Sequence, residues 1–274
     1  MTSEQSNGTG QDQQWVGESL PREEDARLIT GHGQFVDDEK RVGMSYLSLV
    51  RSSFAHARIE NIDVSEAREH PDVECVITGK EIAEEFNPFL QIGPEPGSQI
   101  QDYPLAVDKV RYQGEPVVAL VTRSRLSVED VAELVDVDYT SLDPVIDSEA
   151  ALDDEAVVHD DTAGTNEIFQ DEFDWGDVDE AFEDAEYVIE IDKMRMHRFT
   201  AAPLETNACV AEWEPYGDIE FVTNNTFPTI ALQQIATGLG ISADKIQMET
   251  GDIGGSFGIK INNYPYMMLT AIAS

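Results

Sequence analysis

The chain has 274 residues, 41% of them hydrophobic, which is enough to bury a core as one large or two modest domains. Its 55 Asp and Glu residues outnumber 17 Lys and Arg residues, and the formal net charge of -38 leaves no basic footprint for binding nucleic acid. With only Cys75 and Cys209, this chain alone can hold neither a four-cysteine iron–sulfur cluster nor a structural zinc ion, and we expect both thiols to be reduced and buried.

The acidic residues are most concentrated between residues 126 and 192, where the sequence has no Lys or Arg. They are spread through expected helices and loops whose apolar pattern is intact. This favours a solvated surface adapted to high salt, in which counterions screen the self-repulsion, over an acidic partner-binding surface. We therefore interpret the charge as a feature of a halophilic protein.

Residues 1–20 are predicted to form a disordered, polar and acidic tail. They lack the basic start and the apolar stretch of a signal peptide. No apolar run in the sequence reaches the roughly 18 residues of a membrane span. The expected location is the cytoplasm, without a membrane partner.

Residues 21–146 alternate short apolar runs with Gly, Pro and Asp, which predicts a unit of mixed strands and helices, an α+β fold. One short helix is expected to be capped by Ser65, and another by Ser127, with Asp130 in the capping-box position. The expected strands lie at residues 44–51, 57–64, 73–78, 113–124 and 136–147.

Residues 147–176 show little periodicity and are predicted to form an acidic linker over the surface. A second α+β unit is expected from residue 177 onward, with Pro228 in the first turn of its main helix and Gly240 at its end. The apolar run Met267–Ala273 predicts the start of a buried helix, with nothing after it to cover it. The expected strands lie at 186–196, 208–214 and 218–224, and the expected helices at 177–185 and 226–240.

A glycine-rich stretch, GDIGGSFGIK at residues 251–260, follows a further expected strand. It is not a Walker A loop, because Ile259 separates Gly258 from Lys260 and no Ser or Thr follows the lysine. A dinucleotide fingerprint ending at Gly258 would need glycine at Ile253. Two interpretations remain: exposed amides that bind an oxyanion or a metal-oxo group, or a close strand crossing that needs small residues.

Four further stretches, together with this one, resemble the large, molybdopterin-binding subunit of the molybdenum hydroxylases, the family of xanthine dehydrogenase, aldehyde oxidase and aerobic carbon monoxide dehydrogenase. The glycine stretch resembles the family's GGGFGxK pattern. The others are LPREEDARLITGHGQFVDD, LVRSSFAHARIENIDVSEA, GEPVVALVTRSRLSVEDVAELVDVDYTSLDPVID and HRFTAAPLETNACVAEWE. The resemblance covers nearly the whole chain after the tail, in the family's order. It implies a hammerhead-like α/β domain at 21–146, then the incomplete first part of a molybdopterin-binding α+β domain at 177–274.

The resemblance also implies cofactor contacts in the glycine stretch. Phe257 and Gly258 would lie beside the molybdenum, with the backbone amide near an oxo ligand. Gly254 and Gly255 would let the chain approach the dithiolene of the pterin. Ser256 stands where the family commonly has a third glycine, so it must tolerate that backbone geometry or shift the loop.

Four other positions qualify the resemblance. Xanthine dehydrogenases have Glu directly after the lysine of the motif, whereas this chain has Ile261, which argues against purine hydroxylation and suits the carbon monoxide dehydrogenase-like branch. Arg198 and Glu205 match the family's segment, either as a buried structural pair or as ligand contacts. Thr226 stands where the family often has Gln, which puts one hydrogen bond near the cofactor in doubt.

No catalytic residue and no direct metal ligand is predicted within this chain. The resemblance places the general-base glutamate beyond Ser274. The spacing of His32, His56 and His197 suggests no metal site.

The resemblance implies the N-terminal part of a hydroxylase that uses a molybdenum–molybdopterin cofactor, in its cytosine dinucleotide form, and a water-derived oxygen. We expect this part to be inactive without the C-terminal half of the large subunit. The other implied partners are an iron–sulfur small subunit and an FAD-binding medium subunit in a hetero-oligomer. The alternatives are a non-catalytic assembly or partner-binding fragment and, disfavoured by the failed motif spacings, an unrelated nucleotide-binding protein.

Overall fold

The computed structural model describes residues 16–91, 93–197 and 200–274. The chain divides into two compact units, the first ending at Gln34 and the second spanning Phe35–Ser274. The first unit contains helix α1 (Asp25–Ile29). All other helices and strands of the described residues belong to the second unit, in which we distinguish an N-terminal lobe (residues 46–141) and a C-terminal lobe (residues 203–274).

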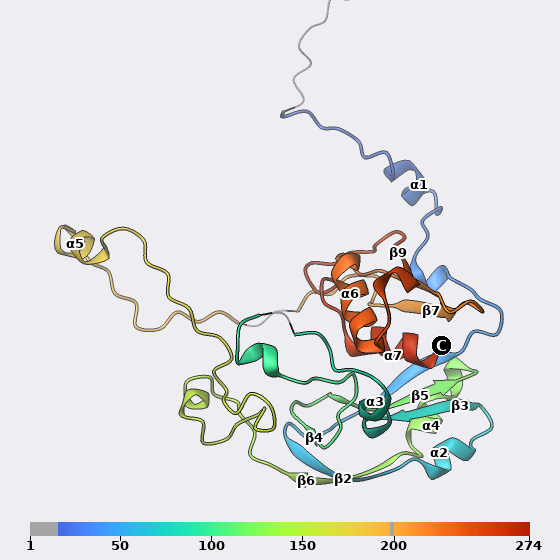
Figure 1. The fold of residues 1–274 in the computed structure, drawn as a ribbon. Coiled ribbons are helices and arrows are strands. Elements are labelled where there is room, and N and C mark those ends of the chain that lie inside the picture. Colours follow the sequence, from blue (N-terminus) through green and yellow to red (C-terminus); the bar gives the residue numbers. More distant parts are fainter. Residues whose placement is uncertain (1–15, 92, 198–199) are drawn as a thin grey trace, which may run out of the picture. The chain divides into compact units, whose positions relative to one another are not determined.

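The N-terminal lobe is built from two antiparallel sheets and three short helices (Figure 1). The first sheet has the order β1 (Tyr46–Arg51), β5 (Pro116–Thr122) and β3 (Val73–Thr78). The second has the order β4 (Lys109–Val110), β2 (Ala57–Asp63) and β6 (Asp136–Ser141). The helices are α2 (Ser65–Glu69), α3 (Gly79–Glu85) and α4 (Val128–Ala132). The predicted α+β class and the five predicted strands of this region are confirmed.

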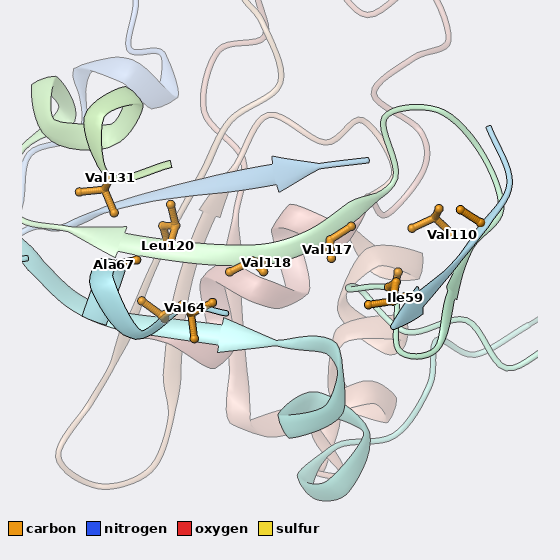
Figure 2. Packing of buried hydrophobic residues seen from close by; sticks show 11 residues of the cluster. Ile59, Val64, Ala67, Val110, Val117, Val118, Leu120 and Val131 are labelled. Atoms are coloured by element: carbon orange, nitrogen blue, oxygen red, sulfur yellow. The ribbon is translucent and has the colours of Figure 1, made fainter. Parts of the chain in front are cut away.

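The core of this lobe forms around β5, whose seven residues are all buried. A continuous run of β-branched and aliphatic residues suits a central strand that is covered on both faces. Figure 2 shows Val117, Val118 and Leu120 along β5, with Ala67 of α2 and Val131 of α4 in the same buried cluster.

The C-terminal lobe contains one three-stranded sheet, in the order β7 (Cys209–Trp213), β8 (Ile219–Thr223) and β9 (Ile246–Glu249). Strands β7 and β8 are antiparallel, whereas β8 and β9 are parallel and are connected through helix α6 (Pro228–Leu239). As predicted, Pro228 occupies the first turn of α6, and Gly240 ends it with a left-handed φ of 68°.

The apolar C-terminal helix, α7 (Pro265–Ala273), is covered, contrary to the expectation from sequence. Met267 packs with β8 and α6, and Leu269 packs with Ile77, Ile82 and Ala119 of the N-terminal lobe. The expectation was wrong because it looked only for residues that follow the helix, whereas the covering residues precede it by 30 to nearly 200 positions. Helix α7 therefore joins the cores of the two lobes.

The capping hydrogen bonds predicted for Ser65 and Ser127 do not form, although Ser127 does occupy the N-cap position of α4 (Val128–Ala132). The Ser65 amide and hydroxyl both donate to Asp63 Oδ1, and α2 begins at Ser65 itself. The Ser127 hydroxyl donates to the carboxylate of Asp72, so α4 has no side-chain cap. A capping box does form at α3, where Thr78 and Glu81 pair reciprocally.

The strand predicted at 186–196 does not form. These residues are exposed throughout and none lies in a strand. The alternating apolar pattern is present, but within the described chain no neighbouring strand supplies the backbone partners that a strand needs. The predicted short helix before it does form, as α5 (Val178–Glu183), with Asp177 accepting the Glu180 amide at 3.0 Å.

Part of the acidic stretch 147–176 is fixed to the N-terminal lobe by two ion pairs. The buried Lys109 ammonium pairs with Asp160. The Arg111 guanidinium donates to both carboxylate oxygens of Asp161, at 2.9 and 3.1 Å. The consecutive acids Asp160 and Asp161 thus pair with Lys109 of β4 and with Arg111, which follows β4. The two basic residues are two positions apart, so in an extended chain their side chains point the same way.

The two cysteines have different environments. Cys75 is exposed, contrary to the expectation of burial, and lies in β3 next to an irregularity in the pairing with β5 between Val73 and Cys75. Burial raises the pKa of the Cys209 thiol to about 12, so this thiol is protonated and unreactive. None of the helices in the described residues combines the length and the apolar character needed to cross a bilayer.

Candidate functional site

Three segments that are far apart in the sequence meet at one edge of the β7–β8–β9 sheet. Because β8 and β9 are parallel, the residues that follow each of them lie at the same edge. Because β7 runs antiparallel to β8, the residues that precede β7 reach this edge too. In open sheets with parallel strands, ligands bind beyond the carboxyl ends of those strands. The chain topology alone therefore marks this edge as the candidate site.

The glycine loop, defined here as Gly251–Lys260, follows β9 at this edge. Its conformation depends on left-handed backbone at Gly255 (φ 99°), Phe257 (φ 50°) and Gly258 (φ 93°). Phenylalanine rarely adopts this conformation, which costs about 1–2 kcal/mol for an L-residue. The loop must therefore be held in place by contacts elsewhere.

Ser256, the departure from the family's third glycine, causes no strain in this loop. Its φ is not in the left-handed region, so a side chain is allowed there. Its hydroxyl oxygen accepts from the Lys260 amide at 3.4 Å and lies 3.5 Å from Thr226 Oγ1. The serine therefore strengthens the turn that follows Phe257.

The outer side of the glycine loop presents open backbone donors. Within the described part of the chain, the amides of residues 255–258 donate to no protein group. Phe257 is 78% exposed, and a Cβ built on Gly258 would meet no atom within 4 Å. Consecutive free amides on a curved loop form the kind of concavity that binds anionic groups. A close approach that needs small residues, the other interpretation left open by the sequence, does not account for Gly258, which is uncrowded.

The inner side of the loop is closely packed. A Cβ on Gly254 would lie 2.4 Å from Glu205 Cβ, and a Cβ on Gly255 would lie 3.1 Å from Pro203 Cβ. The two glycines thus let the loop approach the segment that precedes β7. Small residues at Gly254 and Gly255 are therefore required by packing within the chain, whereas Gly258 has open space beside it.

Glu205 connects both ends of this loop. Its Oε2 accepts from the Gly254 amide at 2.8 Å and from Lys260 Nζ at 2.9 Å. Its Oε1 accepts from the Val36 amide at 3.4 Å. Burial alone would raise the pKa of Glu205, but hydrogen bonds from Gly254, Lys260 and Asn224 outweigh it and hold the pKa below its usual value.

Lys260 is the cation of this pair and is fully buried, while the Glu205 side chain is 13% exposed. The sequence left Glu205 and Arg198 either as a buried pair or as ligand contacts, and Arg198 lies outside the described residues. Lys260 was recognised as part of the motif, but its partner was not. The only sequence features that could have indicated this pair were a lysine at the end of a glycine loop and an acid in the segment before the sheet.

Two buried asparagines, not predicted from the sequence, hold the segment after β8. The Asn224 amide group donates to the Thr206 carbonyl at 2.7 Å, which ties this segment to the one before β7. The Asn225 amide group donates to the Asn262 carbonyl at 2.8 Å, which ties it to the end of the glycine loop. An Asn-Asn pair directly after an apolar strand was the signal that could have revealed them.

Thr226, where the family often has Gln, is also used within the chain. Its amide donates to the Lys260 carbonyl at 2.8 Å, and its hydroxyl donates to the same carbonyl at 3.1 Å. Ile261, directly after the loop, is 46% exposed. An aliphatic side chain therefore stands at the open side of the site.

The three histidines have different surroundings. His56 is buried in the N-terminal lobe, where its Nδ1 lies 2.8 Å from the Asp143 carbonyl, and His197 is exposed. His32 belongs to the first unit, where its ring contacts Thr30. Among the described residues, no group of three or more His, Cys, Asp or Glu side chains could hold a metal ion.

Two family models match this chain. Residues 30–143 match the a/b hammerhead domain of aldehyde oxidase and xanthine dehydrogenase. Residues 158–274 match the molybdopterin cofactor-binding domain, which contains all three segments of the candidate site.

Individual relatives agree with these models. The large subunit of nicotine 6-hydroxylase from Paenarthrobacter nicotinovorans is 34% identical over 94% of this chain and 32% of its own length. The large chain of carbon monoxide dehydrogenase from Hydrogenophaga pseudoflava is 34% identical over 92% of this chain and 32% of its own length. The crystal structure of quinoline 2-oxidoreductase from Pseudomonas putida 86 matches with a TM-score of 0.84, at 32% identity, over 94% of this chain and 33% of that one. The chain thus spans about a third of the length of these relatives.

Proposed function

Because the chain belongs to the molybdenum hydroxylase family, we propose that it forms the N-terminal part of the large, molybdopterin-binding subunit of a hydroxylase or dehydrogenase. The observation that carries this proposal is the glycine loop, whose amides at 255–258 have no acceptor among the described residues. The loop lies at the sheet edge where ligands bind in folds of this kind.

The residues present suit a molybdenum–molybdopterin cofactor. Gly254, Gly255 and Ser256 would form the backbone wall against the pterin. The amides of Phe257 and Gly258 would donate hydrogen bonds to oxygen atoms of the bound group. When bound, this group supplies a two-electron oxidation that uses an oxygen atom from water. The chain's own residues bind and orient it, and the general base would come from sequence beyond Ser274.

The finer assignments are proposals of the same kind. We propose the cytosine dinucleotide form of the cofactor, and iron–sulfur and FAD-binding subunits as partners in a hetero-oligomer. The names of the relatives support a hetero-oligomer, since they describe large subunits or chains and a subunit of a dehydrogenase complex. The exposed Ile261 supports a substrate other than a purine, because an aliphatic side chain cannot hold a purine by hydrogen bonds.

The test is the molybdenum content of the purified protein, with and without the rest of the large subunit. We expect the 274-residue chain alone to contain little molybdenum and to reduce no dye with carbon monoxide, an aldehyde or a purine. Co-expression with the remaining two thirds of the subunit should yield a complex that contains molybdenum. Activity of the 274-residue chain alone would contradict the proposed dependence on the C-terminal part.

A non-catalytic role in assembly is the alternative, and one observation favours it. Residues 187–196 expose six large apolar side chains, a surface suited to a protein partner. The exposed side chains are those of Tyr187, Val188, Ile189, Ile191, Met194 and Met196. The same co-expression distinguishes the two functions, because a stable complex without molybdenum would support assembly alone.

A further inference from the structure

Burial of the ion pair between Glu205 and Lys260 carries a large desolvation free energy. The Lys260 side chain has no exposed surface, and its ammonium lies 2.9 Å from the Glu205 carboxylate. Removing both charges from water offsets much of their attraction, so such a pair adds little net stability compared with apolar side chains of similar size. Stability alone therefore does not account for a buried lysine at the end of an exposed loop.

The geometry of the pair links it to the shape of the loop. One carboxylate oxygen, Glu205 Oε2, receives the amide of Gly254 and the ammonium of Lys260. These residues are the two ends of the stretch that contains the free amides at 255–258. This one atom therefore contacts both ends, in addition to the backbone hydrogen bonds from the Glu205 amide to the Gly254 carbonyl at 3.2 Å and from the Thr226 amide to the Lys260 carbonyl at 2.8 Å.

The stretch between these ends cannot hold its own conformation. It contains three residues with left-handed backbone, one of them Phe257. Its glycines also have many accessible backbone conformations, so ordering them costs conformational entropy. Its internal bonds are few: the Ile259 amide donates to the Ser256 carbonyl at 3.1 Å, and the Lys260 amide donates to Ser256 Oγ at 3.4 Å. Order in this stretch must be imposed from outside it.

We propose that Glu205 and Lys260 are positioning residues, whose buried pair holds residues 254–260 in the cofactor-ready conformation before any cofactor binds. This inference rests on the proposed function for the identity of the ligand, but not for the ordering of the loop. Preorganised amides bind an anionic group more tightly, because the cost of ordering them is not taken from the binding free energy. Neither side chain needs to touch the cofactor for this role.

The test is amide hydrogen exchange in the cofactor-free 274-residue chain. The reporters are the amides of Ile259 and Thr226, which donate to backbone carbonyls rather than to Glu205 or the Lys260 side chain. The amides of β8 and β9 serve as the internal reference for global stability. In the apolar double variant Glu205→Leu/Lys260→Met, we expect both reporter amides to exchange at least tenfold faster than in the wild type. The exchange rates of the reference amides should change by less than about twofold.

Unchanged exchange of both reporters in the folded double variant would overturn the proposal. If the reference amides show that the double variant does not fold, Glu205→Gln takes its place, since glutamine can still accept the Gly254 amide but leaves Lys260 without its counter-charge. Faster reporter exchange in Glu205→Gln supports the positioning role, and exchange at the wild-type rate overturns it.

A second readout separates this inference from the proposed function. In the assembled subunit, the folded double variant should contain less than a tenth of the molybdenum of the wild type. Wild-type molybdenum content in that variant would overturn the positioning role. A different outcome is a wild-type assembly that itself contains no molybdenum, while the reporter amides of the double variant exchange faster as expected. In that case the positioning role stands and the proposed function fails.

Discussion

Glu205 is the residue on which the geometry of the site most depends, since its carboxylate receives hydrogen bonds from the Val36 amide and from both ends of the glycine loop. These bonds favour the ionised form and hold its pKa below the ordinary value of 4.5. A depressed pKa in the folded state means that the ionised carboxylate contributes stability above the pKa of the unfolded chain. That contribution is lost as the pH falls through the folded-state pKa.

The free energy of unfolding of the wild type should therefore exceed that of Glu205→Gln most at neutral pH. The difference should shrink as the pH falls below about 4.5, because protonated Glu205 resembles glutamine. Urea unfolding of both proteins between pH 3.5 and pH 7 measures it. A difference that stays constant over this range would show that the Glu205 charge does not stabilise the fold.

Gly254 and Gly258 should respond differently to alanine. At Gly254 the new Cβ would lie 2.4 Å from Glu205 Cβ, and we expect a loss of about 1–3 kcal/mol from overpacking. At Gly258 the new Cβ would meet nothing, and the loss should be about 1–2 kcal/mol from the left-handed φ alone. Mutation of Glu205 to Gly, which removes this Cβ, should relieve the loss at Gly254 and not that at Gly258, as a double-mutant cycle in urea would show. Equal coupling of Glu205 to both glycines would contradict this packing.

At the scale of elements, the sequence was most informative where local pattern and tertiary context agree. The apolar run of β5 and the Pro228-to-Gly240 boundaries of α6 formed as predicted. Predictions from the local sequence pattern were wrong where the structure depends on a partner that is distant in the sequence or absent from the described residues. Ser127 uses its hydroxyl on Asp72, 55 positions away, and residues 186–196 lack a neighbouring strand in the described chain. Of the site, the sequence singled out the loop, Glu205 and Thr226. It did not reveal Asn224 and Asn225 or the contacts that join these residues to the loop, because they meet the loop only through the order of β7, β8 and β9.

The capping box of α3 gives a prediction at this scale. Thr78 and Glu81 satisfy each other's backbone amides at the start of the helix. Mutation of Thr78 to Ala should cost about 1 kcal/mol, whereas Thr78→Ser, which keeps the hydroxyl, should cost less than half of that. Urea midpoints of the two variants measure the difference. Equal losses would show that the methyl group of Thr78, rather than the cap, is what matters.

At the scale of the whole molecule, the net charge of -38 is the dominant feature. Ion pairs compensate part of it, as at Lys109 and Arg111, but most of the acids face solvent. Like charges at this density repel one another and destabilise the compact state, and salt screens that repulsion.

The melting temperature should therefore rise as KCl increases from 0.01 to 0.3 M, a range in which the Debye length falls from about 30 Å to below 10 Å. Sucrose at matched osmolality is the control, because it strengthens burial without screening charge. A melting temperature that does not change with KCl, or that falls, would contradict the halophilic interpretation of the composition.

The central claim is that the glycine loop binds the molybdenum cofactor, and a pair of matched glycine variants tests it most directly. Gly258 and Gly217 both have a left-handed φ, 93° and 86°, and both have open space where a Cβ would be. Gly217 lies in the turn between β7 and β8, at the opposite edge of the sheet. Aspartate at either position should cost similar stability, but only at 258 would it place a negative charge against an anionic ligand.

The measurement is the molybdenum and pterin content of the assembled large subunit, per polypeptide, in the wild type, Gly258→Asp and Gly217→Asp. We expect Gly217→Asp to retain the wild-type content and Gly258→Asp to retain less than a tenth of it. Equal content in the two variants would contradict the assignment of the glycine loop as the cofactor-binding element.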